Sequence, residues 1–555
     1  MSRTFLSLIF PVFLLVPSLA RGQEQAPSEP APFIEWLRTA RASGYTMHAG
    51  SVPDKCNFRV VAEVLRGWER FSPEYRRQIR TILRPPTLDT SIVSPSGFFE
   101  IHFDTTGLDA PAMLDNDGNR QPGTAFLYAV AVAAAFDYAY QQEIDSIGYE
   151  RPPFQFGSSR YHVYVKNMGG GLYGVTWPVN PYSYKYRRPT YTSYIEVDND
   201  YKGYFSPGLE GLSVTAAHEF HHAIQLGGYG FWDNDTFFYE LSSTFMEDRV
   251  YPDINDYYLY LKELFNEPEK PFFKRSGYDL ALFGILMYRQ YGDTVLLETW
   301  TNTRSMPPMF ALDEALKKQG SQMVNEYCTF SLWNYFTGYR ADTSQSYREG
   351  AAYPTTKILQ KTEIVNTQAM FFDELKPLAT EYLQAFKGPD TVTFVVANAH
   401  PDYSLQKLNV PAQYTLDVRT EGYDDSYRQL TNGWGYKLVG SEENTFCYVA
   451  VLSGAVGGVC ETGVYPNPYR PAYNDLLTFR IGDKVPPRVD LAVFTPAMEA
   501  VYRQNLRVQK IGGCWTVTWN GRLSNGRAIP PGVYFYTVSY KGRTEYGKFA
   551  VVDRR

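Results

Sequence analysis

Apolar residues recur with helical spacing along the first part of the chain, for example around Leu65 and Trp68, with many charged residues between them. This period predicts helices within residues 33–84. The Pro85-Pro86 pair that follows ends this segment, because proline cannot continue a helix.

From residue 98 the pattern alternates between apolar and polar side chains, as is typical of strands. Three such runs are residues 98–103, 161–165 and 194–197, and an Ala-rich helix is predicted at about 123–144. Helical patterns then dominate from 212 to about 335, and short strands with turn residues follow after 355. The order predicts an α+β region followed by β-sandwich modules.

The chain begins with a short basic start, an apolar run and small residues near position 20, which is the pattern of a secretory signal peptide. A membrane anchor is the alternative, but the run is shorter than the ~20 residues of a spanning helix, and two prolines interrupt it. The whole pattern divides the chain into residues 1–20, 21–93, 94–350, 351–462 and 463–555. The second of these opens with a Pro-rich linker and continues as the helical N-terminal segment.

Composition narrows the choice of function. The 555 residues are 44% hydrophobic and 20% charged, which excludes global disorder. With a net charge of −6 the chain has no excess of basic residues to bind phosphates, so nucleic acid is not expected as a partner. After the signal peptide no stretch is long and apolar enough to span a bilayer, so we expect a mature chain without a transmembrane segment.

The chain has five cysteines, an odd number that leaves at least one unpaired within the chain. Cys447 and Cys460 flank an apolar, Gly-rich stretch. A disulfide between them stays open at this point, because spacing alone does not show whether their Cβ atoms meet.

The strongest chemical signal is His218-Glu219-x-x-His222, on a predicted helix with Ser213 as a candidate N-cap. Residues four apart share one face of a helix, so both imidazoles can bind a single Zn²⁺. Glu219 can then reach a metal-bound water without being a ligand itself. His221 faces about 100° away from His222 and is not expected to be a ligand.

A catalytic zinc normally takes a third protein ligand. Glu240, Thr244 and Glu247 fall at i, i+4 and i+7, on one stripe of a second predicted helix whose other residues are largely apolar. Buried carboxylates are costly unless they bind a metal or a basic partner. Glu240 and Glu247 are therefore both candidate ligands, and a solvated helix face is the non-functional interpretation.

These motifs resemble those of the gluzincin, or thermolysin-like, metallopeptidases, which have a ligand glutamate on the helix after the H-E-x-x-H helix. The resemblance implies that His218, His222 and Glu240 bind one catalytic Zn²⁺ and that Glu219 is the general base. Glu247 would then lie behind the ligands. The chain departs from the thermolysin pattern at Thr244, where an acid is expected, which leaves open how the histidines are oriented. Related enzymes also stabilise the oxyanion with a Tyr or His, and Tyr278 is one candidate.

Residues 94–340 also resemble a family of secreted bacterial metallopeptidases, through the segments around Ile101, Ile195 and His218. The resemblance implies a zincin-type domain over 94–350 in which substrate backbone adds to an edge strand of the sheet. Residues 193–198 are the candidate for that strand. Residues 198–200 (Asp-Asn-Asp) could bind Ca²⁺, although a polar turn at the end of a strand is favoured.

The segment before residue 94 is a candidate pro-region, in which Cys56 could coordinate the zinc of a latent form. A buried structural cysteine or a small helical cap is the favoured interpretation of the same residues.

Residues 463–555 contain Asn-Gly and Pro-Gly turns between alternating strands. They resemble the C-terminal sorting domains of the type IX secretion system and the flagellar hook-assembly-type Ig-like domain; an ordinary β-sandwich spacer is the alternative. The resemblance implies a protein that is secreted or held at the bacterial surface, with the outer-membrane secretion machinery as a partner. Residues 351–462 carry no recognisable chemistry beyond a β-sandwich pattern.

The sequence therefore predicts a secreted zinc metallopeptidase, an endopeptidase acting on protein or peptide substrates. The alternative is a non-catalytic surface binding or adhesion protein on a metallopeptidase-like fold.

Overall fold

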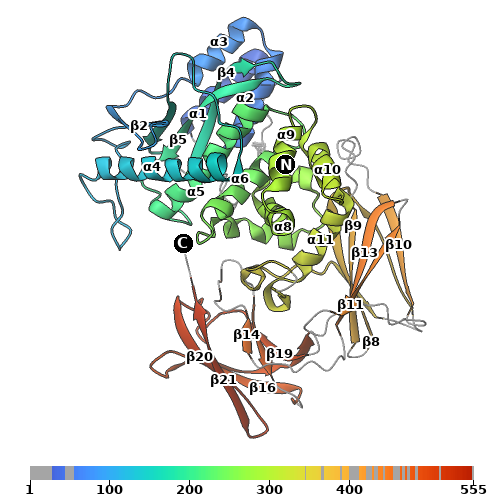
Figure 1. Cartoon of the computed structure of the whole chain (residues 1–555). Coiled ribbons are helices and arrows are strands. Elements are labelled where there is room, and N and C mark those ends of the chain that lie inside the picture. The colour runs from blue at the N-terminus through green and yellow to red at the C-terminus, as the bar shows by residue number, and fades with distance from the viewer. Residues whose placement is uncertain are drawn as a thin grey trace, which may run out of the picture.

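The computed structural model describes residues 28–43, 55–169, 171–343, 346–363, 368–387, 390–398, 412–419, 428–429, 435–441, 444–453, 463–465, 469, 471, 476–481, 485–511 and 514–552. The predicted signal peptide lies outside these residues. The chain forms mixed α/β structure first and β-rich structure afterwards (Figure 1).

The α+β region is built around a five-stranded sheet in the order β1-β2-β3-β5-β4. The strands are β1 (Thr90–Val93), β2 (Phe99–Phe103), β3 (Tyr161–Lys166), β4 (Gly174–Ser183) and β5 (Thr190–Asp198). β2, β3 and β5 run parallel, whereas β1 and β4 run antiparallel to their neighbours at the two edges.

Helices cover both faces of this sheet. On one face lie α4 (Ala125–Tyr140) and α5 (Leu209–Ile224), and on the other lie α1 (Pro30–Ser43), α2 (Phe58–Arg70) and α3 (Pro73–Ile82). Tyr161 on β3 packs against Phe220 of α5, with ring centroids 6.5 Å apart. On the opposite side the hydroxyl of Tyr194 donates to the carbonyl of Leu83 at 2.9 Å, and Arg41 of α1 pairs with Glu196. All nine residues of β5 are consequently buried.

The prediction that residues 193–198 form the edge strand is wrong. They lie in β5, which hydrogen-bonds to β3 on one side and to β4 on the other. Alternation of apolar and polar residues, as in Tyr194-Ile195-Glu196-Val197, is typical of a strand with one face in the core and one in solvent. The N-terminal helices cover the polar face instead, and β4 is the edge next to α5.

A helical layer follows the sheet, as the period of residues 212–335 predicts. It contains α6 (Thr236–Val250), α7 (Leu261–Asn266), α8 (Ala281–Tyr291), α9 (Thr294–Asn302), α10 (Pro308–Lys318) and α11 (Met323–Tyr335). Helix α5 begins at Leu209 after Gly208, so Ser213 lies inside the helix and is not its N-cap. α5 packs against α6, which brings the two motif-bearing helices together.

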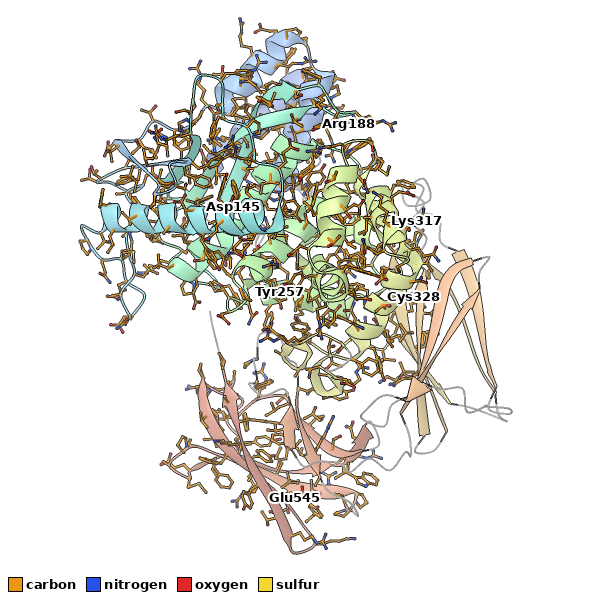
Figure 2. The ribbon with its side chains drawn as sticks, viewed as in Figure 1. Asp145, Arg188, Tyr257, Lys317, Cys328 and Glu545 are labelled. Carbon is orange, nitrogen blue, oxygen red and sulfur yellow. The ribbon has the colours of Figure 1, made fainter. Side chains whose placement is uncertain are left out.

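The remainder of the described chain is β-rich. The first part contains β6 (Gln360–Glu363), β7 (Gln368–Leu375), β8 (Ala379–Lys387), β9 (Asp390–Asn398), β10 (Ala412–Arg419), β11 (Arg428–Gln429), β12 (Gly435–Ser441) and β13 (Asn444–Ser453). They form a six-stranded sheet and a two-stranded sheet. Cys328 on α11, labelled in Figure 2, is disulfide-bonded. The Cys447–Cys460 pairing that the sequence leaves open lies outside the described side chains.

The C-terminal strands form two four-stranded sheets, ordered β14-β15-β19-β18 and β17-β16-β20-β21. Their bounds are β14 (Gly463–Tyr465), β15 (Leu477–Ile481), β16 (Arg488–Phe494), β17 (Ala500–Arg507), β18 (Gln509–Ile511), β19 (Cys514–Trp519), β20 (Gly532–Tyr540) and β21 (Arg543–Val551). Phe479, Trp519 and Tyr536 belong to a hydrophobic core of their own, distinct from the core of the α+β region.

In the part of the chain that the structure describes, no helix combines the length and the apolarity that crossing a bilayer requires.

Candidate metal centre

The two histidines of the H-E-x-x-H motif lie on one buried face of α5, four residues apart. The Nε2 atoms of His218 and His222 are 3.1 Å apart, and the two side chains are 0% and 1% exposed. Two imidazole nitrogens this close repel each other unless a proton or a metal cation lies between them.

Glu240 on α6 completes a triangle with these nitrogens. Its Oε2 atom lies 3.3 Å from Nε2 of His218 and 3.6 Å from Nε2 of His222. Oε2 is buried and makes no hydrogen bond that satisfies standard geometry among the described residues. A buried carboxylate oxygen in that condition is costly unless something else binds it.

The distances fit a single metal ion. Nitrogen and oxygen ligands of tetrahedral Zn²⁺, at about 2.0–2.2 Å from the ion, lie roughly 3.3–3.6 Å from one another. The three separations above span 3.1–3.6 Å. Two imidazoles and a carboxylate form a common donor set for a catalytic zinc. The residues present therefore fit Zn²⁺ at this position.

The other ring nitrogens of the histidines are held by hydrogen bonds. Nδ1 of His218 donates to Glu247 at 2.7 Å, and Nδ1 of His222 donates to the side-chain oxygen of Gln225, also at 2.7 Å. Such bonds fix the tautomer in which Nε2 has its lone pair free for a metal. Glu247 and Gln225 thus orient the histidines, a role that the sequence pattern left open at Thr244.

The electrostatics of the cluster favour a positive charge among these groups. Burial alone would lower the pKa of His218, but the neighbouring carboxylates of Glu240 and Glu247 outweigh it and raise the pKa to about 9. Burial opposes ionisation of Glu240, but the close approach of His218 and His222 lowers its pKa to about 2. The carboxylates that favour this proton would equally favour a divalent cation in its place.

Glu219 lies beside the cluster and faces the edge strand. It is 0% exposed, its Oε2 accepts a hydrogen bond from Thr176 of β4 at 2.7 Å, and its Oε1 has no hydrogen-bond partner among the described residues. Burial raises the pKa of Glu219 to about 8. Gly174 at the start of β4 makes this approach possible, because a Cβ there would lie 2.8 Å from Cγ of Glu219.

Tyr278 reaches the cluster from η5 (Tyr278–Leu280), a short 3₁₀ helix. Its hydroxyl donates to Oε1 of Glu240 at 3.2 Å. The preceding Gly277 has φ of +111°, and a Cβ there would lie 2.6 Å from Cβ of Glu240. Only glycine allows η5 to approach α6 so closely.

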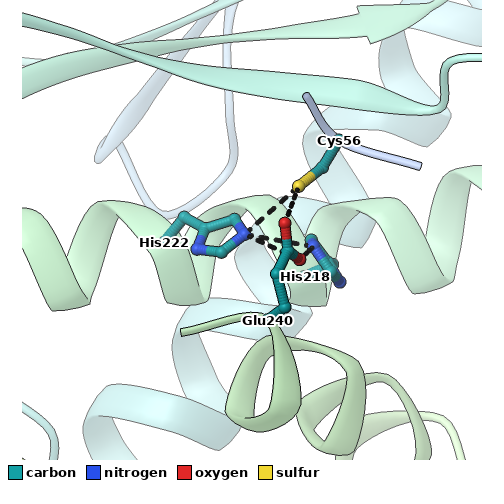
Figure 3. A group of neighbouring side chains, drawn as sticks. All are labelled: Cys56, His218, His222 and Glu240. Atoms are coloured by element: carbon teal, nitrogen blue, oxygen red, sulfur yellow. Dashed lines mark hydrogen bonds and ion pairs between the residues drawn. The ribbon is translucent and has the colours of Figure 1, made fainter. Parts of the chain in front are cut away.

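Cys56, just before α2, is the fourth member of the cluster (Figure 3). Its Sγ lies 3.4 Å from Nε2 of His222 and 3.1 Å from Oε1 of Glu240, and the residue is 1% exposed. The sequence favoured a structural role for this cysteine. No local pattern distinguishes it, because it is 166 residues from His222 in the chain.

Other candidate residues are engaged elsewhere. His221 points away from the cluster and bonds Glu143 at 2.7 Å. At the Asp-Asn-Asp turn, Asp198 accepts backbone N–H groups, and Arg120 pairs with Asp200. These contacts give the carboxylates of Asp198 and Asp200 partners within the protein, as expected for a polar turn that does not need Ca²⁺.

A second group of potential ligands consists of Glu100, His102 and His162 on β2 and β3. The two histidines hydrogen-bond each other at 2.9 Å, and His162 also bonds Ser158. These contacts already satisfy three of the four ring nitrogens, so this group has less need of a metal than the cluster on α5 and α6.

Comparisons with known proteins give no family. No protein-family model matches the chain, and neither does any curated protein. Among solved structures, PorZ, an essential surface component of the type-IX secretion system of Porphyromonas gingivalis, is 16% identical over 32% of this chain and 23% of its own, with a TM-score of 0.16. Dimeric latent PorU from the same organism is 16% identical over 36% of this chain and 19% of its own, with a TM-score of 0.14. The chain thus spans less than a quarter of either protein, and likenesses at these TM-scores decide nothing about its fold or activity.

Proposed function

We propose that the chain is a secreted zinc-dependent peptidase of zincin type, similar to the gluzincins. The observation that carries this proposal is the meeting of His218, His222 and Glu240 at ligand-to-ligand distances, with Glu219 beside them against an edge strand. A structural zinc needs no carboxylate with a free oxygen next to it. A hydrolase needs one, because a general base must accept the proton of the attacking water.

Each residue has a defined part in this reaction. Zn²⁺, when bound, supplies a Lewis acid that lowers the pKa of water and polarises the scissile carbonyl. Glu219 takes a proton from the attacking water at its free Oε1 and returns it to the departing amine. The Tyr278 hydroxyl, now on Glu240, is placed to donate to the developing oxyanion. The substrate backbone adds to the edge strand β4.

The alternative is a non-catalytic surface protein in which the metal only stabilises the fold. One observation favours it: Cys56, His218, His222 and Glu240 together form a closed set of four ligands. Structural zinc sites are closed in this way, whereas catalytic sites keep an open position.

Peptide cleavage separates the two functions. The zinc-loaded full chain, and its Cys56→Ser variant, would be incubated with a library of peptides, and the products identified by mass spectrometry. Cleavage at internal bonds is expected for an endopeptidase. An intact library with both proteins, each carrying its metal, would favour the non-catalytic alternative.

We also propose that residues 463–555 direct the chain across the outer membrane. The proposal is supported by the resemblance of their turns and strands to type IX sorting domains, and by their separate hydrophobic core. Deleting them is expected to trap a protein with an intact α+β region in the periplasm, because the two cores are independent. Cell fractionation with an antibody measures this. Normal secretion of the shortened chain would make these residues a spacer.

A further inference from the structure

Residues 55–58 lie across the candidate metal centre and close it. Lys55, Cys56, Asn57 and Phe58 are each at most 2% exposed. Their backbone is held on two sides of the site: the carbonyl of Lys55 accepts from the amide of Tyr173 at 2.8 Å, and the amide of Cys56 donates to the Tyr278 hydroxyl. Tyr173 directly precedes the edge strand β4. The segment therefore lies where a substrate joining that strand would approach the metal.

The thiol of Cys56 is positioned to occupy the place of the attacking water. It lies within 3.4 Å of Nε2 of His222 and within 3.1 Å of Oε1 of Glu240. A cysteine beside Zn²⁺ deprotonates and binds the metal as a thiolate. If Cys56 supplied the fourth ligand of a bound metal, the position that water and substrate need would be taken. Oε1 of Glu219, which has no hydrogen-bond partner in the described part of the chain, would then have no water to act on.

Lys55 anchors the segment through charge. Its Nζ lies 2.6 Å from Glu247 and 2.5 Å from Asp256, and 4.5 Å from the centre of the Tyr173 ring. The lysine side chain is 1% exposed and both carboxylates are fully buried. Two buried carboxylates without a cation are strongly unfavourable. If Lys55 leaves, this pocket requires another positive group.

Phe58 adds an apolar contact to the same closure. Its ring stacks on the imidazole of His222, with centroids 4.4 Å apart and the planes within 8°. A second stacked contact, with centroids 5.2 Å apart, joins it to Tyr239 on α6. One short segment thus supplies a thiol, a charged group and an aromatic ring. Each of the three contacts the metal cluster or a residue that orients it.

We propose that residues 55–58 are a built-in inhibitor of the candidate peptidase: Cys56 occupies the fourth metal position, and Lys55 occupies a substrate pocket. This inference rests on the proposed function. Withdrawal of the segment would open the site and leave a place for water beside His222 and Glu240. The vacated pocket between Glu247 and Asp256 accepts a Lys or Arg side chain, so the substrate class is a peptide with a basic residue at the cleavage site.

The test compares full-length wild-type protein with Cys56→Ser and Cys56→Ala, and with Ala62→Ser as a control for a polar change at a buried small residue of α2. X-ray absorption at the zinc edge is expected to detect one sulfur ligand at about 2.3 Å in the wild type and the control, and none in the two Cys56 variants. Their peptide cleavage should rise about 10–100-fold over wild type, because the competent form is no longer a minor population.

Substrate class is measured with the Cys56→Ser protein and matched peptides that carry Lys, norleucine or Glu at one position. Cleavage of the Lys peptide is expected to be about tenfold faster or more, because a buried carboxylate pair then regains its cation. Equal rates for the three peptides would overturn the assignment of the pocket.

The outcomes also separate this inference from the proposed function. Zinc without sulfur in an active wild-type protein would overturn the inhibitory segment and leave the peptidase intact. A sulfur ligand in the wild type, with no cleavage by any zinc-loaded variant, would overturn both and identify a structural metal site.

Discussion

Replacing Glu219 with Gln is expected to lower peptide cleavage by about 10²–10⁴-fold while the protein keeps its zinc. Gln has the same shape and can still accept the hydrogen bond from Thr176, but it cannot take a proton from water. The change also spares the three ligands His218, His222 and Glu240. This variant and its control would be made in the Cys56→Ser background. The initial rate of peptide cleavage and the zinc content would be measured on the same preparations.

Glu143→Gln is the matched control for this substitution. Glu143 is also fully buried and also contacts α5, through His221, but it does not touch the metal cluster. Its variant should retain cleavage close to that of the parent protein. Loss of zinc from Glu219→Gln would show that Glu219 supports the metal and would remove its assignment as a base. Unchanged cleavage with full zinc would make another group the base.

Removing the metal is expected to destabilise the α+β region and abolish cleavage together. Without the metal, the buried Glu240 faces two imidazoles that can share only protons with it. A ligand that binds the folded state alone stabilises it by an amount that grows with the logarithm of the ratio of free ligand concentration to Kd. At a hundredfold excess over Kd this is about 2.7 kcal/mol. The midpoint of thermal unfolding should therefore fall by roughly 5–10 °C after chelation and recover on adding Zn²⁺.

Two variants test whether this fall in the unfolding midpoint comes from zinc at the candidate site. Glu240→Ala should already lack zinc, so chelation should not lower its unfolding midpoint further. Glu247→Gln should still bind zinc, with affinity about 10–100-fold weaker, because Glu247 orients His218 and is not itself a ligand. The reverse pattern, with zinc lost from Glu247→Gln and kept by Glu240→Ala, would make Glu247 the ligand.

The parts of the site that follow from local periodicity could be predicted from the sequence. An i, i+4 spacing places His218 and His222 on one helix face whatever the rest of the fold does. The i, i+7 stripe of Glu240 and Glu247 likewise fixes a face of α6. Which carboxylate would face the metal depends on how α5 and α6 pack, and the distances now favour Glu240 as a ligand and Glu247 as the partner of Nδ1.

The parts that depend on distant contacts could not be predicted. Nothing near Cys56 or Lys55 in the sequence indicates that both are buried against helices far along the chain. The edge strand was misassigned for a related reason. Glu196 reads as a solvent-facing residue of a half-buried strand, but Arg41 pairs with it under the N-terminal helices. When the partner of a buried polar side chain is far away in the sequence, the local pattern of residues does not show that the side chain is buried.

The central claim is that one zinc ion lies among His218, His222 and Glu240. Anomalous X-ray diffraction from crystals of the full chain, collected on both sides of the zinc absorption edge, tests it most directly. We predict a single strong peak within bonding distance of both Nε2 atoms, of a Glu240 oxygen and of Sγ of Cys56. Zinc-containing crystals with no peak there, or with the peak at Glu100, His102 and His162 instead, would contradict the claim.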